Sequence, residues 1–474
     1  MQYCLKSSIG CVLALVLGGC AIQKYRAAPI SPVESAASLE SRNLQDRGLE
    51  QFLEQNLGHA PNAWPLKTWN LDTLTLAALY FNPSMQIARD RAAVAKAAVI
   101  TAGARPNPTL SMKPGIPSPY LFGLNFAIPI QTAGKRGYRI LQAKNLSDAA
   151  RLDLGDTAWT VRSRVRLALL NYLANWRSAG LLQTQERLLQ KQVELLQQRL
   201  TVGQIPRPEV DAAAIQLSNT RLALRAGEGR IAETRATLAA AIGVPVAALD
   251  GIELEWPNLD VLPTEDSLSV REIQREALLN RLDVRRALAQ YEAGQASLQL
   301  EIAKQYPDFQ IGPGYTYEEK ENFFTLGFSM AIPILNRNQG PIAEAEARRK
   351  EAAASFLATQ AQVIADSEKA LARYRAALGE LKEAEDTLTK LQSAREQMAR
   401  RSFELGESDA LALNGIQLQT VAATQAKLNA LILAQTSLGE LEDAVQRPLE
   451  PSQLVPVLPD WKHAPEDSAK EKHR

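Results

Sequence analysis

The sequence predicts a mainly α-helical protein that also contributes strands to a membrane β-barrel. Three observations lead to this fold class. The chain repeats itself, because Leu124–Ile130 reads LNFAIPI and Phe328–Ile334 reads FSMAIPI. Each copy contains a very long proline-free stretch of helix-forming residues, and each contains segments with a strict two-residue alternation of apolar and polar side chains. A long-period repeat marks a duplicated architecture, so every element is expected twice.

The first residues have the form of an export signal. Lys6 supplies a positive charge, residues 9–17 are apolar but too few to span a bilayer as a helix, and Leu17–Cys20 reads LGGC, which resembles a lipobox. We expect residues 1–19 to be a signal peptide and Cys20 to be lipidated after cleavage. Ala21 follows the cysteine where an aspartate would signal inner-membrane retention, so we expect the outer membrane of a Gram-negative cell, with a lipid anchor and a periplasmic extension.

The repeat defines the expected domain organisation. After an extended N-terminal segment over residues 20–70, the first copy occupies residues 71–250 and the second occupies residues 270–446. A linker over residues 251–269 separates them, and a partly disordered tail fills residues 447–474. The second copy is five residues longer between its alternating segments, which predicts a longer loop in its hairpin.

Each copy contains a helix of unusual length. Residues 137–201 and 343–405 contain no proline and are rich in Ala, Leu, Glu, Gln, Lys and Arg. At about 1.5 Å per residue such a helix extends on the order of 95 Å, so it must lie along other long helices. Seven-residue apolar seams support this packing. They are Leu181, Leu188, Leu195 and Val202 in the first copy, Ala384, Leu391, Met398 and Leu405 in the second, and Leu182, Leu189 and Leu196 beside the first.

Each long helix ends at a turn and is followed by a second helix. Gly203 and Gly406 lie at these turns, and glycine just beyond a helix end is typical of a helical hairpin. Glu209 and Asp409 lie where the returning helices begin, and acidic side chains at this position cap free amide groups.

Four segments alternate with period two, and each has one large apolar face and one small polar face. They are residues 109–116, 120–130, 309–317 and 324–334. Strands of about 9 to 11 residues with this pattern suit a membrane barrel. A membrane barrel needs about eight strands or more, so four strands cannot close one. The open edges of a sheet are not tolerated in lipid, so two or three copies must combine. Pro129 and Pro333 mark the expected joint where each copy leaves the barrel and becomes a helix.

Composition excludes several classes of function. The chain has 53 Lys and Arg against 52 Asp and Glu, so it lacks the basic excess that nucleic-acid binding needs. It has three histidines, and none of them lies near a cysteine or a carboxylate cluster with ligand spacing: His59, His463 and His473. We therefore expect no catalytic residue, no resident metal and no cofactor, and we do not expect an enzyme.

Taken together, these features resemble the TolC-like outer-membrane efflux proteins. The resemblance rests on the twofold repeat, the hairpins that end in AIPI, the turn NRNQG at residues 336–340 and the glycine tips, and it covers roughly residues 71–446. The NRNQG turn and the sequence VGQIPRPEVD at residues 202–211 look most like the heavy-metal-efflux branch.

The resemblance implies a homotrimer in which twelve strands form one outer-membrane barrel and twelve helices continue it as a periplasmic tunnel. Such a protein is a passive exit duct of a tripartite efflux pump, for metal cations or small toxic compounds. Its implied partners are a periplasmic adaptor, also called a membrane fusion protein, an inner-membrane pump of the RND type, and outer-membrane lipid. Gly203 and Gly406 would then contact the adaptor at the periplasmic tip.

The resemblance also suggests residues for the pore entrance. Glu209, Asp211 and Asp409 are candidates for a gate, although Glu209 and Asp409 equally suit helix capping. Well-known members carry inward-facing carboxylates after the second tip. Here the matching stretch, residues 410–415, reads ALALNG without an acid, so Asn414 is the candidate to line the entrance.

Two other functions fit part of the sequence. A periplasmic adaptor is also a lipoprotein with a helical hairpin, but it would have one hairpin flanked by compact β domains. A structural coiled-coil lipoprotein without a pore would have no use for four alternating strands. The duplicated hairpins and the strands favour the exit duct over both.

Overall fold

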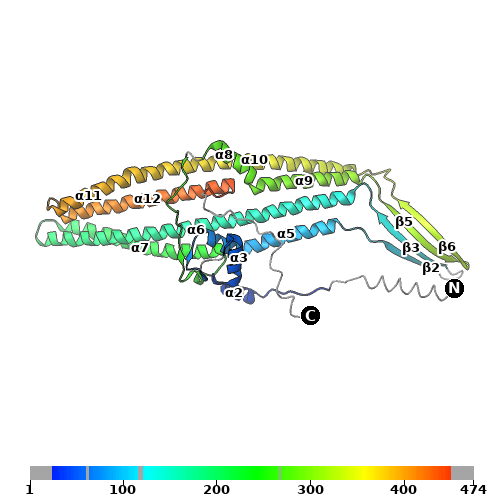
Figure 1. Cartoon of the computed structure of the whole chain (residues 1–474), viewed down its shortest axis with the longest axis horizontal. Helices are drawn as coiled ribbons and strands as arrows, with labels where there is room; N and C mark the ends of the chain where they lie inside the picture. Colours follow the sequence, from blue (N-terminus) through cyan, green and yellow to red (C-terminus); the bar gives the residue numbers. More distant parts are fainter. Residues whose placement is uncertain (1–23, 60–62, 116–120, 266–267, 450–474) are drawn as a thin grey trace. The chain divides into compact units, whose positions relative to one another are not determined.

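The structure is a computed structural model that describes residues 24–59, 63–115, 121–265 and 268–449 (Figure 1). The expected signal peptide, Cys20 and most of the expected tail lie outside the described residues. The chain divides into two compact units, Met1–Arg42 and Asn43–Arg474. The described part of the first unit contains helix α2 (Pro32–Glu40), which Ser31 caps. The elements described below belong to the second unit.

The second unit begins with a helix that the sequence analysis missed. Helix α3 (Arg47–Leu57) lies within the segment predicted to be extended, so that prediction is wrong here. Asp46 caps the helix by accepting a hydrogen bond from the backbone N–H of Leu49 at 2.9 Å. Leu49 and Leu53 lie on one face and are fully buried, which stabilises the helix by packing.

The two copies contain matching elements in the same order. The first copy consists of α4 (Leu71–Phe81), α5 (Pro83–Ala102), β2 (Thr109–Gly115), β3 (Leu121–Ile130), α6 (Lys135–Thr201) and α7 (Arg207–Ile242). The second consists of α8 (Val270–Asn280), α9 (Leu282–Ala303), β5 (Phe309–Glu318), β6 (Glu321–Met330), α10 (Gln339–Lys382), η3 (Glu383–Thr389), α11 (Lys390–Glu404) and α12 (Ala410–Val445). The short helix η1 (Val246–Leu249) and strand β4 (Glu253–Leu254) follow α7, and β4 pairs in parallel with β1 (Thr68–Trp69).

The long helices are present, with one interruption. Helix α6 is continuous over 67 residues. In the second copy, the prediction of an unbroken helix is wrong at η3, which is π-helical and separates α10 from α11. There the Thr389 hydroxyl donates to the Ala384 carbonyl at 2.6 Å, a spacing of five residues that matches the wider π-helical turn. Glu385 in η3 also pairs with Lys427 of α12 at 2.8 Å.

The four long strands form one antiparallel sheet in the order β2-β3-β5-β6, and they lie side by side in Figure 1. Its register confirms the predicted faces. Apolar residues oppose one another on one face, for example Leu110 and Phe126, or Ile311 and Phe328. Small polar residues oppose one another on the other face, as Ser111 and Asn125 do. In the described chain β2 and β6 are the two edges of this sheet, and neither has an outer partner.

The extra residues of the second hairpin belong to its strand ladder. Strand β5 has 10 residues where its counterpart β2 has 7, and β6 and its counterpart β3 have 10 residues each. Glu319 and Lys320 alone connect β5 to β6, and their φ angles of 50° and 72° are those of a tight hairpin turn. The prediction of a longer loop is therefore wrong, because pairing the added residues satisfies their backbone hydrogen bonds.

The two largest apolar cores of the described residues hold the helices together. The first includes Leu49, Leu74, Leu169 and Leu238, contributed by α3, α4, α6 and α7. The second includes Ile273, Leu371 and Leu438, contributed by α8, α10 and α12.

A buried ionic cluster fastens α6 to α12. Arg162 is 2 % exposed, Glu442 is fully buried, and they form a salt bridge of 3.0 Å. Arg166 approaches the same carboxylate oxygen at 3.4 Å. Gly439 makes room for this arrangement, because a Cβ atom there would collide with the Arg166 guanidinium. The neighbouring Asp443 accepts a hydrogen bond from the Trp159 indole at 2.8 Å, and burial raises its pKa above the ordinary value.

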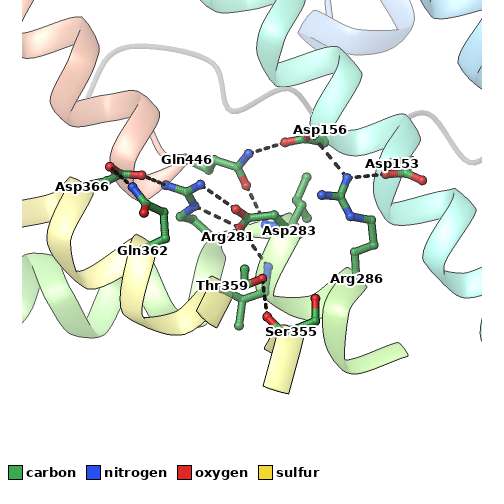
Figure 2. A network of polar contacts seen from close by, with 12 residues as sticks. Asp153, Asp156, Arg281, Asp283, Arg286, Ser355, Thr359, Gln362, Asp366 and Gln446 are labelled. Atoms are coloured by element: carbon green, nitrogen blue, oxygen red, sulfur yellow. Dashed lines mark hydrogen bonds and ion pairs between the residues drawn. The ribbon is translucent and has the colours of Figure 1, made fainter. Parts of the chain in front are cut away.

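A second polar network joins the two copies where α9 begins, as Figure 2 shows. The Gln446 side chain lies at its centre. Its Oε1 accepts a hydrogen bond from the Leu282 backbone N–H at 2.6 Å, and its Nε2 donates to Asp156 of α6 at 2.7 Å. The residue that ends α12 thus connects the first helix of one hairpin to the start of α9.

Charged residues at the start of α9 complete this network (Figure 2). Arg281 pairs with Asp283 at 2.6 Å, and Arg286 reaches back to Asp153 of α6. Burial by itself raises the pKa of Asp283, but the hydrogen bonds and charge of Arg281 outweigh it and hold the pKa below the ordinary value. The carboxylate therefore stays charged and paired at neutral pH.

Candidate functional site

The tip of the first helical hairpin is a glycine-dependent turn. Gly203 has a φ angle of 74°, in the left-handed region that favours glycine. The Gln204 N–H donates to the Arg199 carbonyl at 2.9 Å, and the Gly203 N–H donates to the Leu200 carbonyl at 3.0 Å. These two bonds define a Schellman motif, which satisfies the last carbonyls of α6.

The second tip has the same construction. Gly406 has a φ angle of 76°. The Glu407 N–H donates to the Ser402 carbonyl at 2.9 Å, and the Gly406 N–H donates to the Phe403 carbonyl at 3.0 Å. Open space surrounds both glycines, so their requirement for glycine is a backbone requirement and not a matter of packing.

Asp409 connects the two tips. It caps α12 by accepting a hydrogen bond from the Ala412 N–H at 2.8 Å, and it forms a salt bridge with Arg199 of α6. The Ala412 N–H first, and then the Arg199 guanidinium, hold the pKa of Asp409 below its ordinary value. Leu411 packs nearby against a small cluster that contains Leu196 and Val210 of the first hairpin.

Glu209 and Asp211 lie on the exposed surface of α7. Helix α7 begins at Arg207 after Pro206, and no side chain caps it. Glu209 lies in its first turn, where a negative charge interacts favourably with the helix dipole, but it is not the cap. Asp211 pairs weakly with Arg207 of the same helix at 3.8 Å. Of the three acidic gate candidates, Asp409 is the one with a salt bridge between the hairpins.

Asn414 is enclosed between helices. It is 1 % exposed, and its side-chain amide donates to the Leu188 carbonyl of α6 at 3.0 Å. In this state the side chain holds α12 against α6 and is not available to line an entrance, contrary to the prediction.

Sequence reasoning missed Arg199, which forms the contact between the tips. An arginine in the last turn of a helix interacts favourably with the helix dipole, and this local role hides any second role. Its partner Asp409 is 210 positions away, so no spacing rule in a single sequence links them.

The joint between the sheet and the helices also depends on a contact that sequence spacing does not reveal. Lys135, at the start of α6, is 7 % exposed and pairs with Asp308 at 2.7 Å. Asp308 immediately precedes β5, and it also accepts a hydrogen bond from the Thr132 N–H at 2.8 Å. The end of β3 is thereby tied to the beginning of β5. Pro129 lies within β3 opposite Gln310, whereas Pro333 lies beyond the end of β6.

Exposed apolar stripes mark the outer edges of the helical layer. In α7, Ile215 and Leu222 are 63 % and 69 % exposed and lie seven residues apart. In α11, Leu391 and Met398 are 65 % and 64 % exposed and also lie seven residues apart. In α6, by contrast, Leu189 is fully buried. In the predicted seam of the second copy, Leu391, Met398 and Leu405 are therefore exposed, whereas Ala384 packs against a small core. The best-packed seam of the first copy is the line through Leu189.

Two kinds of feature are absent from the residues that the structure describes. Within the ranges that the structure describes, no helix combines the length and the apolar character needed to cross a membrane. Over the same ranges, His, Cys, Asp and Glu side chains nowhere gather in a group of three or more that could hold a metal ion.

Comparisons with known proteins give consistent matches. The model of the outer membrane efflux protein family matches residues 75–244 and 273–445, one range in each copy. The cobalt-zinc-cadmium resistance protein CzcC of Cupriavidus metallidurans is 25 % identical over 235 residues, which are 49 % of this chain and 55 % of that protein. The match thus spans about half the length of that relative.

Solved structures share the fold. CusC superposes with a TM-score of 0.64 at 17 % identity, covering 82 % of this chain and 95 % of CusC. The outer membrane protein VceC of Vibrio cholerae superposes with a TM-score of 0.65 at 19 % identity, covering 80 % of this chain and 97 % of VceC. At this level of identity the likeness establishes the arrangement of helices and strands.

Proposed function

The chain belongs to the outer membrane efflux protein family, and on this premise we propose that three copies form the outer-membrane exit duct of a tripartite efflux pump. The duct conducts its cargo passively from the periplasm to the exterior. A periplasmic adaptor meets the helical tips at Gly203 and Gly406, and an inner-membrane pump of the RND type supplies the energy. Cys20 anchors the N-terminus in the outer membrane through its lipid.

The four-stranded sheet is the observation that carries this proposal. Its apolar face suits lipid, and its two free edges require partners there, because unpaired backbone groups are costly in hydrocarbon. The strands alternate in direction, so β6 of one copy runs antiparallel to β2 of the next, and the ring closes. Two copies would give about eight strands, whose interior side chains fill the barrel, whereas three copies leave an opening.

The exposed helical stripes support the same ring. Helices α7 and α11 lie at opposite edges of the helical layer, so in a ring α11 of one copy meets α7 of the next. Ile215 lies nine positions beyond Pro206, and Met398 lies eight positions before Gly406. With the tips level, a rise of about 1.5 Å per residue brings these two side chains to the same height.

We expect the pair Ile215→Cys and Met398→Cys, introduced into one chain, to cross-link neighbouring copies into covalent trimers on mild oxidation. Non-reducing electrophoresis of isolated outer membranes measures the product. Ile215→Cys paired with Leu391→Cys is the matched control, because the second site is one heptad, about 10 Å, away along α11. Equal cross-linking of both pairs, or no species larger than a monomer, would argue against this interface.

The pairing of Arg199 with Asp409 closes the entrance in this proposal. The side chains are 34 % and 54 % exposed, so each pair contributes only about 0.2–1 kcal/mol. Three pairs act together in a trimer, and their loss shifts the balance between open and closed tips roughly 3- to 150-fold.

Arg199→Ala is therefore expected to raise the open probability in planar-bilayer recordings. Arg207→Ala is the control, because Arg207 pairs within α7 and does not bridge the tips.

Lowering the pH should raise the open probability as Arg199→Ala does. Asp409 has a lowered pKa, so the link is present above the ordinary pKa and is lost as the pH falls through the lowered value, below about 4. An acid response that persists unchanged in Arg199→Ala would assign it to another group.

The cargo we propose is a divalent metal cation, on the basis of the similarity to a cobalt-zinc-cadmium resistance protein. A duct must release what it carries, so specificity resides in the pump and not in a tight site within the tunnel. Deleting the gene and measuring growth in Co²⁺, Zn²⁺ and Cd²⁺, and separately in organic toxicants, tests the cargo. Sensitivity to the organic compounds alone would replace the metal by that class of cargo.

A further inference from the structure

The repeated AIPI sequence has a different structure in each copy. In the first copy, Ala127–Ile130 lies in β3, and its last three residues pair with β5. In the second copy, β6 ends at Met330, and Ala331–Ile334 has no strand partner. Its two isoleucine side chains are exposed, Ile332 by 71 % and Ile334 by 73 %. The same four residues are thus a strand in one place and unpaired in the other.

The difference follows from what lies beside each segment. The ladder between β2 and β3 ends with Thr109 opposite Ala127, so the rest of the first AIPI segment pairs on its other side only, with β5. The ladder between β5 and β6 ends one pair earlier, with Phe309 opposite Met330, which correspond to Leu110 and Phe126. The second AIPI segment has therefore also left its first neighbour, but no strand lies on its other side within the described chain.

The internal repeat identifies the strand that would pair with Ala331–Ile334. Strand β5, which pairs with the first AIPI segment, is the first strand of the second hairpin. Its equivalent is β2, the first strand of the first hairpin, whose outer edge is free. We infer that Ala331–Ile334 extends β6 when it pairs with β2 of a second copy of this chain. This inference rests on the proposed trimeric duct and adds to it a segment that becomes a strand only on assembly.

The internal repeat also gives the register of this pairing. In β3 and β5, Ile128 lies opposite Ile311 and Ile130 lies opposite Phe309. The two AIPI sequences give the equivalent positions in the second strand of each hairpin: Ile128 corresponds to Ile332, and Ile130 corresponds to Ile334. The first strands are aligned by the prolines that precede them, Pro108 and Pro307. In this alignment Met112 corresponds to Ile311, and Leu110 corresponds to Phe309. Transferred to the interface, the register places Ile332 opposite Met112 and Ile334 opposite Leu110 of the next copy.

The exposure of the partners agrees with this register. Met112 is 60 % and Leu110 is 51 % exposed, and both lie on the apolar face of the sheet. Pairing them with Ile332 and Ile334 places apolar side chains opposite one another across the interface, as the described sheet does within one chain. A shift by one residue would turn the isoleucines to the polar face, so the register is strongly specified.

Paired cysteines test this register in the full chain in outer membranes. We expect Ile332→Cys with Met112→Cys to give covalent trimers on oxidation, to an extent similar to the intrachain cross-link of Ile128→Cys with Ile311→Cys. The intrachain pair is the positive control, because it occupies the equivalent positions, and mass spectrometry of the linked peptides measures it. The single-cysteine variants correct for any reaction of Cys20.

The negative control is Phe328→Cys with Met112→Cys, which the inferred register separates by four residues, or about 13 Å along the strand. Cross-linking of this pair at the level of Ile332→Cys with Met112→Cys, or the absence of cross-linking at Ile332 in an intact trimer, would overturn the inference. If Ile332 does not cross-link in an intact trimer, lipid and not a neighbouring strand would contact the two isoleucines.

The tip pair Ile215→Cys with Met398→Cys separates this outcome from failure of the trimer itself. If the tip pair cross-links and the Ile332 pair does not, the strand extension is wrong and the duct stands. If neither pair cross-links, the trimeric duct falls with it.

Discussion

Replacing Glu442 with alanine is expected to lower the free energy of unfolding by about 3–5 kcal/mol, because it removes the buried carboxylate that pairs with Arg162 and Arg166. Glu442 is fully buried and pairs with Arg162 at 3.0 Å. Its other oxygen accepts a hydrogen bond from the Leu449 N–H at 2.9 Å. The substitution therefore removes a charge and an acceptor together at the contact between α6 and α12.

The measurement is denaturant unfolding of the detergent-solubilised protein, with Glu440→Ala as the matched control. Glu440 lies two positions away on the same helix and pairs with Arg373 at 2.8 Å, but the two side chains are 44 % and 53 % exposed. Its loss should cost at most about 1 kcal/mol. Equal destabilisation by the two variants would show that burial of the ionic cluster does not contribute as described.

Replacing Leu326 with lysine is expected to prevent the sheet from inserting into a bilayer. Leu326 lies in the middle of β6 on the apolar face, opposite Pro313, and is 76 % exposed in the single chain. A lysine facing lipid near the bilayer midplane costs about 2–4 kcal/mol, and a trimer carries this cost three times. The folded, membrane-inserted fraction after reconstitution into liposomes measures the effect.

Thr325→Lys is the matched control for this prediction. Thr325 is the preceding residue of β6, and it lies on the polar face opposite Gly314. Its side chain faces the interior of the proposed barrel, where a lysine remains in water, so insertion should be nearly unchanged. If both variants insert equally well, or if only Thr325→Lys fails, the assignment of the two faces is wrong.

The sequence was sufficient to predict those elements that local periodicity determines. Period-two alternation identified the apolar face of the sheet, and glycine positions identified the two tips, because Gly203 and Gly406 adopt a backbone conformation that other residues rarely adopt. The expected joint at Pro129 and Pro333 stays a prediction, because Pro129 lies within β3 and Pro333 lies beyond the end of β6. Each of these signals depends on neighbours within a few residues of one another.

The contacts that the sequence did not reveal are those between distant charged residues. No local pattern singles out Arg162 or Glu442, and only the packing of α6 against α12 buries them together. Arg199 and Asp409 meet for the same reason. The π-helical segment η3 was missed because residues 383–389 contain neither glycine nor proline. Helix α3 could have been found, since Asp46 and the spacing of Leu49 and Leu53 are ordinary helix signals.

The central claim is that copies of this chain enclose a conducting pore, and recording from the purified Arg199→Ala variant in a planar bilayer tests it most directly. The account predicts discrete conductance steps that are more frequent than in the unaltered protein. It would be contradicted by a variant that cross-links into trimers at Ile215→Cys and Met398→Cys and yet never conducts at any applied voltage.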